Sequence, residues 1–209
     1  MGIQERKERE KERRRRQILV AAKHIFYKKG FNKTTMEDIA SAAELSPGTL
    51  YLYFKNKDEL FASLSLRILR YLLIRLEEVE KQKDLNSWKR LELLQETICD
   101  VYEFDPLMFV KMFHLQSGHT YQNLTSQLQE EIRELSRNSL HAIARLIEDA
   151  MDKKKMIKQS PGKLAEMIWA FFSGVVLFDA NKKIIKNKDS DLKPTLNIAF
   201  EIFLRGIQK

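Results

Sequence analysis

The sequence lacks several features on which common classes of protein depend. It has one cysteine, Cys99, so no internal disulfide can form, and apolar neighbours predict a buried structural thiol. Its seven glycines are scattered and form no phosphate-binding loop. No apolar run is long enough to span a bilayer, and the charged first residues lack the apolar core of a signal peptide. These absences predict a cytoplasmic protein.

The four histidines form no pattern typical of a metal site. His114 and His119 are five residues apart, which places them on different faces of a helix, and no HExxH or CxxC motif occurs. Cys99 has no candidate base near it in the sequence. The sequence therefore predicts no metal, no cofactor and no catalytic residue, which disfavours an enzyme.

Positive charge is concentrated at one end of the chain. Residues 1–57 contain 14 Lys and Arg against 7 Asp and Glu, a net charge of +7 out of +8 for the whole chain. A basic N-terminal part on a nearly neutral remainder is the electrostatic footprint of a nucleic-acid binder. Arg and Glu alternate within residues 1–12, so this segment can also be a solvated run that frays.

The stretch Thr34–Lys57 predicts two short helices joined by a tight corner. Thr35 is the N-cap expected for the first helix, and Asp38 three residues later completes a capping box. Ser46 caps the second helix, with Pro47 at the first helical position. Because the residue before a proline avoids helical angles, the first helix must end before Ser46. Two helices around such a corner are typical of a helix-turn-helix, whose second helix enters the DNA major groove.

The sequence TTMEDIASAAELSPGTLYLYFKNKDEL is similar, nearly position by position, to the DNA-binding signature of the tetracycline-repressor (TetR) family of bacterial transcriptional regulators. The resemblance covers about residues 15–64. One departure is Glu44, where many members carry the glycine of the corner. A non-glycine residue in a left-handed conformation costs roughly 1–2 kcal/mol. The resemblance implies a DNA-binding transcriptional regulator, a repressor by family default, that responds to a small molecule.

The predicted DNA contacts divide by task. The start of the second helix brings side chains and backbone towards base edges, whereas tyrosine hydroxyls, a lysine and a capping threonine are expected on phosphates. The resemblance assigns the same positions to DNA, although each tyrosine can instead be a half-buried packing residue. The predicted contacts are Thr35, Ser46, Pro47, Gly48, Thr49, Tyr51, Tyr53 and Lys57.

The hydrophobic pattern predicts helices throughout and no strand, hence an all-α fold of about nine helices. Residues 1–56, the headpiece, are expected to form a three-helix DNA-binding domain whose first helix runs from Arg13 to Lys29. Residues 57–209 are expected to form a larger helical bundle for ligand binding and dimerisation. Further helices are expected at residues 57–83, 87–102, 106–116, 124–153, 162–181 and 192–207.

The helix predicted at residues 162–181 is apolar around nearly its whole circumference, so every face must be covered. One face can pack on the chain's own core, and a second molecule can cover another, which predicts a four-helix interface across a two-fold axis. A central helix in a monomer is the alternative. The resemblance implies that the last two helices dimerise. The residues expected at this interface are Phe171, Gly174, Val175, Phe178, Leu196, Phe200 and Phe203.

Aromatic residues and methionines are dense on two of the predicted helices. This composition suits an adaptable apolar pocket for a fatty acyl compound, a lipophilic drug or another apolar or amphipathic effector. Ordinary core packing is the alternative for each residue. The predicted ligand-binding residues are Phe104, Met108, Phe109, Met112, Trp169 and Phe172.

Dimerisation would let two headpieces meet successive major grooves about 34–36 Å apart, so the predicted target is a near-palindromic duplex. Two rival classes remain open. A basic amphipathic N-terminus can bind anionic membranes, but no Trp or Leu anchor precedes Ile18, so no membrane partner is expected. A helical scaffold for a protein partner would not need the Ser-Pro-Gly-Thr helix start or the asymmetry of charge.

Overall fold

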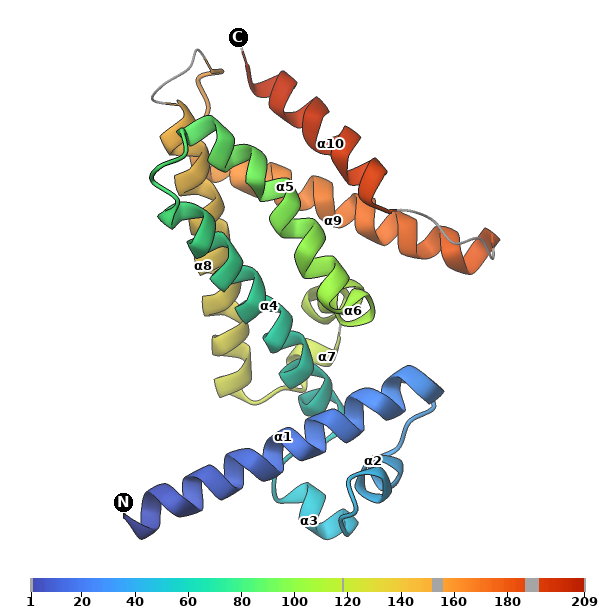
Figure 1. Cartoon of the computed structure of the whole chain (residues 1–209). Helices are drawn as coiled ribbons and strands as arrows, with labels where there is room; N and C mark the ends of the chain where they lie inside the picture. The colour runs from blue at the N-terminus through green and yellow to red at the C-terminus, as the bar shows by residue number, and fades with distance from the viewer. Residues whose placement is uncertain (1, 118, 152–155, 187–191, 209) are drawn as a thin grey trace. The chain divides into compact units, whose positions relative to one another are not determined.

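The computed structural model describes residues 2–117, 119–151, 156–186 and 192–208, and within these ranges the chain is helical between its loops (Figure 1). A lone antiparallel bridge joins Met156 to Gln208. The all-α fold class predicted from the sequence is confirmed. The helices are α1 (Ile3–Lys29), α2 (Met36–Ala42), α3 (Pro47–Tyr51), α4 (Lys57–Lys81), α5 (Ser87–Phe104), α6 (Pro106–Ser117), the short α7 (His119–Gln122), α8 (Ser126–Met151), α9 (Pro161–Lys186) and α10 (Leu192–Ile207).

Helix α1 begins ten residues earlier than the sequence predicts, at Ile3 rather than Arg13. The apolar residues that the prediction used begin only at Ile18, whereas the earlier turns are supported by polar side chains. The backbone N–H of Gly2 donates to the Glu5 carboxylate at 3.1 Å, and Arg13 forms an ion pair with Glu10 at 2.6 Å. Pairs at this spacing stabilise a helix without any apolar face.

The chain divides into two compact units. The first comprises Met1–Leu66 and Leu115–Gln129 and contains the first three helices. In it α1 packs on α2, and α2 packs on α3. The core side chains are almost completely buried and come from these three helices, the segment after α3 and the start of α4. They are Ile18, Ala22, Ile39, Leu50, Phe54 and Leu60.

The second unit comprises Arg67–His114 and Glu130–Lys209. Helix α10 packs against α9 and α5, and the rings of Phe172 and Phe200 stack with centroids 5.7 Å apart. Buried Arg90 is neutralised by Asp149 at 3.0 Å. In the part of the chain that the structure describes, no helix meets the length and apolarity needed to cross a bilayer.

Candidate nucleic-acid interface

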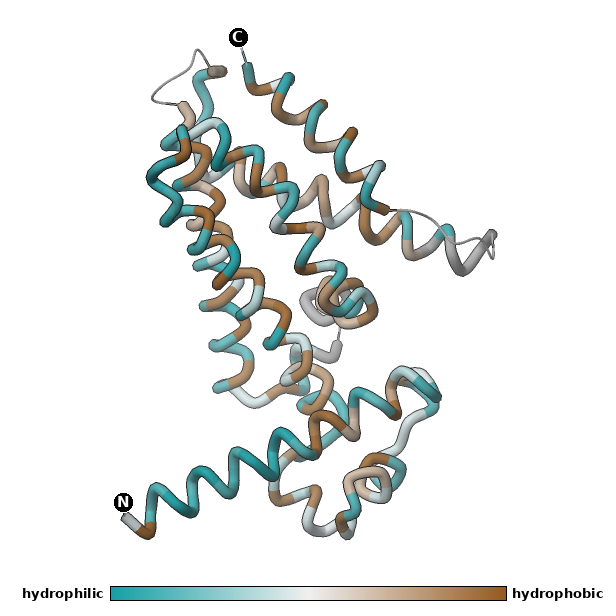
Figure 2. The backbone as a smooth tube through the Cα atoms, in the orientation of Figure 1, coloured by the Kyte–Doolittle hydropathy of each residue, from teal (hydrophilic) through white to brown (hydrophobic). Residues whose placement is uncertain are grey.

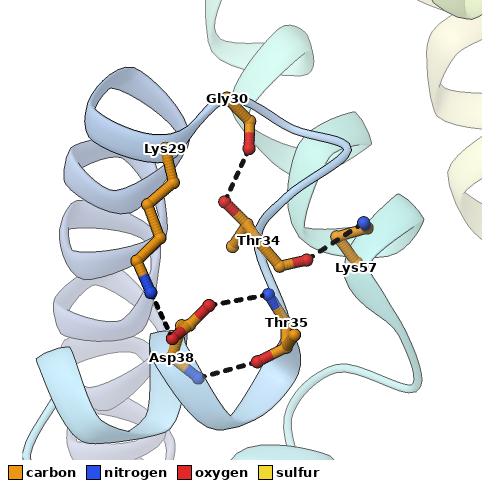
Figure 3. Close-up of polar contacts among 6 residues, drawn as sticks. All are labelled: Lys29, Gly30, Thr34, Thr35, Asp38 and Lys57. Carbon is orange, nitrogen blue, oxygen red and sulfur yellow. Dashed lines mark hydrogen bonds and ion pairs between the residues drawn. The ribbon is translucent and has the colours of Figure 1, made fainter.

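The first helix of the predicted motif, α2, begins with a reciprocal cap (Figure 3). The Thr35 hydroxyl accepts from the backbone N–H of Asp38, and the Asp38 carboxylate accepts from that of Thr35, both at 3.1 Å. Lys29 donates to the same carboxylate at 2.6 Å, and this bond, with that from Thr35, holds the pKa of Asp38 below its usual range. The predicted capping box is confirmed, and it joins α2 to the last turn of α1.

The corner between α2 and α3 adopts the left-handed backbone conformation for which many family members use glycine. Glu44 has φ of 56°, in the region that favours glycine. The next amide, that of Leu45, donates to the Ala40 carbonyl at 2.9 Å and closes the turn. Glu44 therefore carries the backbone strain expected of a side chain at this position.

The second helix, α3, begins as predicted with Ser46 as N-cap and Pro47 as its first residue. The Ser46 hydroxyl accepts from the Thr49 amide at 3.1 Å and lies 2.8 Å from the Thr49 hydroxyl. Leu50 is fully buried, which directs the other faces of this short helix outwards. Leu52 follows α3 and is 83% exposed. The sequence does not mark this apolar side chain as exposed, although the spacing places it opposite Leu50.

Arg15 of α1 fixes the far end of α3. Its guanidinium lies 4.3 Å from the centroid of the Phe54 ring, donates to the Tyr53 carbonyl at 3.4 Å and donates to the Ser63 hydroxyl at 3.0 Å. Gln17 donates from the same helix to the Ala43 carbonyl at 3.1 Å, at the end of α2. Helix α1 thus holds both helices of the motif by directional bonds as well as by its apolar face.

Lys57, predicted to bind a phosphate, is also a structural tie. Its ammonium donates to the Thr34 carbonyl at 3.0 Å (Figure 3). It also donates to the Phe31 carbonyl at 2.9 Å and lies 4.5 Å from the centroid of the Phe31 ring. The Thr34 hydroxyl in turn donates to the Gly30 carbonyl at 2.8 Å. An ammonium has three donors, so one stays available for a phosphate. The phosphate contact stays a prediction.

All the predicted DNA-binding residues lie in the first unit, on the helix-turn-helix or at the start of α4. Their exposure does not divide by predicted task, because Thr49, expected at base edges, and Tyr53, expected on a phosphate, are both partly covered. The DNA contacts themselves stay predictions. Thr35, Ser46, Pro47, Gly48 and Tyr51 are exposed, whereas Thr49, Tyr53 and Lys57 are half-buried.

The predicted ligand-binding residues lie in the second unit, but they do not share one environment. Ring contacts link α6 to α9, from Phe109 to Phe113 at 5.3 Å and from Phe113 to Trp169 at 5.7 Å. Phe104 is half exposed and packs on Tyr71 at 4.5 Å, so it does not lie with the buried set. The buried members are Met108, Phe109, Met112 and Phe172, each at most 2% exposed.

The predicted dimer residues divide between the surface and the core. On α9, Phe171 is 41% exposed, Phe178 is 64% exposed, and Gly174 between them is open to solvent. Val175 and Phe203 are half-buried.

On α10 the prediction needs correction, because Leu196 and Phe200 are 1% and 2% exposed and offer a second chain almost no surface. They face the protomer's own α9 and α5. The exposed apolar residues of this helix are Ile198 and Ile202, each 60% exposed. Met167 on α9, 60% exposed, was also missed.

Other chemistry is sparse in the described residues. They contain no group of three or more His, Cys, Asp or Glu side chains placed to hold a metal ion. Burial raises the pKa of the Cys99 thiol to about 11, so at neutral pH it is an inert core residue rather than a nucleophile.

The capped helix-turn-helix on an all-α chain defines a protein of the DNA-binding regulator class. Residues 18–64 match the family described as "Bacterial regulatory proteins, tetR family". The chain therefore carries the DNA-binding domain of TetR-family helix-turn-helix transcriptional regulators. The family assignment made from the sequence is confirmed.

Relatives extend the likeness beyond the headpiece. The chain is 27% identical over 172 residues to the uncharacterised regulator YhgD of Bacillus subtilis, which covers 81% of this chain and 85% of that protein. The fold of this chain matches that of PfmR, a TetR-family regulator from Thermus thermophilus, with a TM-score of 0.71 and 17% identity. The match covers 92% of this chain and 99% of PfmR. The fold also matches FadR from Bacillus subtilis, solved with stearoyl-CoA, with a TM-score of 0.67 at 20% identity over 92% and 98%.

Proposed function

We propose that this TetR-family regulator is a repressor that binds a near-palindromic operator as a homodimer and leaves it when a small, largely apolar or amphipathic effector binds. The headpiece, residues 1–56, would bind the operator, and residues 57–209 would dimerise and hold the effector. The observation that carries the proposal is the exposed start of α3, capped by Ser46, with Pro47 and Gly48 open to solvent. The site of action would be the cytoplasm.

In this proposal Pro47, Gly48 and Thr49 approach base edges, because they form the N-terminal end of α3. Thr49 is held by the Ser46 cap, so its hydroxyl is fixed relative to the helix start. Tyr51 and Tyr53 would place their hydroxyls on phosphates, and Thr35 with Lys57 would take further phosphates from the other side of the motif. Contacts of the first kind specify sequence, and those of the second kind set position and affinity.

Dimerisation is supported by the exposed apolar surface of the last two helices. Met167, Phe171 and Phe178 recur at helical spacing on α9, and Ile198 and Ile202 do so on α10. Gly174 has no atom within 4 Å of where a Cβ would lie, so a second helix can approach closely there. Large apolar side chains that are 41–64% exposed and grouped on two helices that pack together are typical of an interaction surface.

The effector is proposed to be apolar or amphipathic because the aromatic and methionine side chains of α6 and α9 gather in the second unit. Because FadR from Bacillus subtilis, which has a similar fold, was solved with stearoyl-CoA, long-chain acyl compounds are the first class of effector to test. Helix α4 is continuous from Lys57 to Lys81 and contributes residues to both units, so it is the element proposed to couple the effector to the spacing of the headpieces.

The experiment that tests the DNA proposal is selection of bound duplexes from a random pool, followed by affinity measurements on the enriched site. We expect a near-palindrome with half-sites one helical turn apart. Substitution Thr49→Ala should change the preferred base at one position of each half-site, whereas the wild type and a Lys158→Ala control on the second unit should agree. No enrichment at low salt, or equal loss with Thr49→Ala on every site, would contradict the proposal.

The effector proposal is tested by adding candidate compounds to the protein–duplex complex. Stearoyl-CoA, free stearate and a neutral lipophilic drug would be compared with coenzyme A alone, which shares the polar group but has no acyl chain. Release by the acyl compounds and not by coenzyme A is the expected result. Release by none of them, with no mass adduct in native mass spectrometry, would remove long-chain acyl compounds from the candidates.

A further inference from the structure

The N-terminal half of α1 extends the headpiece beyond its own core. The first buried residue of α1 is Ile18, yet the helix begins at Ile3. Figure 1 shows this part of α1 running past α2 and α3, and Figure 2 shows that it is almost wholly hydrophilic. Residues 3–16 contain eight Lys and Arg against four Glu, so this segment supplies most of the positive charge of the headpiece.

One line of basic side chains continues the face on which α1 packs. Ile18 is fully buried in the headpiece core, and side chains four, seven and eleven residues before it share its face of the helix. These three positions are Arg14, Lys11 and Lys7, which we call the basic stripe. The stripe therefore lies on the side of α1 that carries the helix-turn-helix.

Bonds from neighbouring residues support this orientation. Gln17 donates to Ala43 at the end of α2, and Arg15 donates to Tyr53 just beyond α3. Arg14 donates to the side-chain oxygen of Gln17 at 3.2 Å and also interacts electrostatically with Glu10.

The opposite face of α1 is also basic but is differently placed. Arg6, Arg9 and Arg13 lie twelve, nine and five residues before Ile18, which turns them away from the core side of the helix. Arg13 is paired with Glu10 at 2.6 Å, so part of this charge is locally neutralised. The two faces give a matched pair of charge sets for an experiment.

We propose that the basic stripe binds the phosphates of duplex DNA beside the base pairs that α3 reads. This inference rests on the proposed operator binding and adds a second contact surface to it. At 1.5 Å per residue the stripe spans about 11 Å, which corresponds to about three phosphates of one strand. Flexible or frayed residues would lose this register, whereas a helix presents the three charges in one row. Ile3 is the one apolar side chain in the segment, which disfavours insertion into a lipid surface.

The test compares two triple variants that remove the same charge from the full-length protein. The stripe variant is Lys7→Gln, Lys11→Gln and Arg14→Gln, and the control variant is Arg6→Gln, Arg9→Gln and Arg13→Gln. The affinity of each variant is measured over a series of NaCl concentrations, on the selected duplex extended by flanks of at least about one helical turn. A second duplex, trimmed to the half-sites, removes the DNA that the stripe would contact.

The stripe variant is expected to lower the slope of log affinity against log salt by up to about 2.7 per headpiece, and the control variant to leave it nearly unchanged. On the trimmed duplex the wild type should approach the stripe variant. Equal slopes for the two variants would overturn the inference, and so would an unaltered slope for the stripe variant. Failure of the wild type to bind any duplex would overturn the proposed function instead. Vesicles of anionic lipid that bind the wild type better than the duplex would also overturn the inference.

Discussion

Two residues of the headpiece have backbone angles of positive φ, Gly30 at 79° and Glu44 at 56°. Gly30 ends α1, where its amide donates to the Phe26 carbonyl at 3.0 Å and its carbonyl accepts from Thr34. A Cβ built on Gly30 would meet no atom within 4 Å, so the positive φ, and not a lack of space, favours glycine at this position. Glu44 occupies a similar angle with a side chain and carries the strain that Gly30 avoids.

Replacement of Glu44 by glycine should stabilise the protein. Relief of the left-handed conformation offers roughly 1–2 kcal/mol, and the greater freedom of glycine in the unfolded chain takes back about 0.5–1 kcal/mol. The free energy of unfolding, from urea denaturation, should therefore rise by about 1 kcal/mol. The control Ser41→Gly lies in α2 at helical angles and should lower it by about 0.5–1 kcal/mol. A loss of stability with Glu44→Gly would show that the carboxylate has an unrecognised role.

Replacement of Lys57 by alanine should weaken binding to every duplex alike. The slope of log affinity against log salt should fall by about 0.9 per headpiece, the equivalent of one phosphate. Because the ammonium also ties Phe31 and Thr34, thermal stability should fall as well. Lys158→Ala, which removes a charge from the second unit, should leave both quantities unchanged. An unchanged slope would remove Lys57 from the DNA contacts and leave it a purely structural residue.

Among the helices, those with local start signals could be predicted from the sequence and those set by distant packing could not. Thr35 and Ser46 announce α2 and α3 within three residues, because a cap is a local interaction. The start of α1 carries no apolar pattern and was placed too late. On α10 two apolar pairs, Leu196–Phe200 and Ile198–Ile202, have the same spacing, and only the fold determines which pair faces inwards.

The exposed face of α9 makes a prediction about assembly. The double substitution Phe171→Glu and Phe178→Glu places two charges on side chains that are 41% and 64% exposed, so each protomer should still fold. We expect light scattering to give the mass of a monomer, circular dichroism to be unchanged, and operator affinity to collapse. Lys163→Glu, elsewhere on α9, should leave the dimer intact. A variant that keeps the wild-type dimer mass would contradict the proposed interface.

At the scale of the whole molecule, net charge is unevenly distributed along the chain. The first 57 residues carry a net charge of +7 and the rest +1, whereas the exposed apolar residues of α9 and α10 lie near the C-terminus. Long-range electrostatic attraction therefore contributes to DNA binding by the headpiece, whereas short-range apolar contacts would hold the proposed dimer interface together. Added salt should weaken DNA binding without dissociating the dimer.

Coupling between the proposed effector and DNA must be reciprocal. If an acyl compound lowers operator affinity by some factor, operator DNA must lower the affinity of that compound by the same factor. The compound's affinity can be measured by calorimetry with and without the selected duplex, using a scrambled duplex as control. An effector affinity that the operator does not change, although the compound releases the DNA, would indicate direct competition at the headpiece.

The ammonium of Lys57 joins the first turn of α4 to the loop between α1 and α2, and Arg15 joins α1 to the residues beyond α3. Because these hydrogen bonds hold its helices together, the helix-turn-helix has little freedom to bend internally when α4 moves. Amide hydrogen exchange within residues 15–54 should then be equally slow in the released and the DNA-competent states. The helix-turn-helix would then move as a rigid body, and the effector would change its position and not its internal structure.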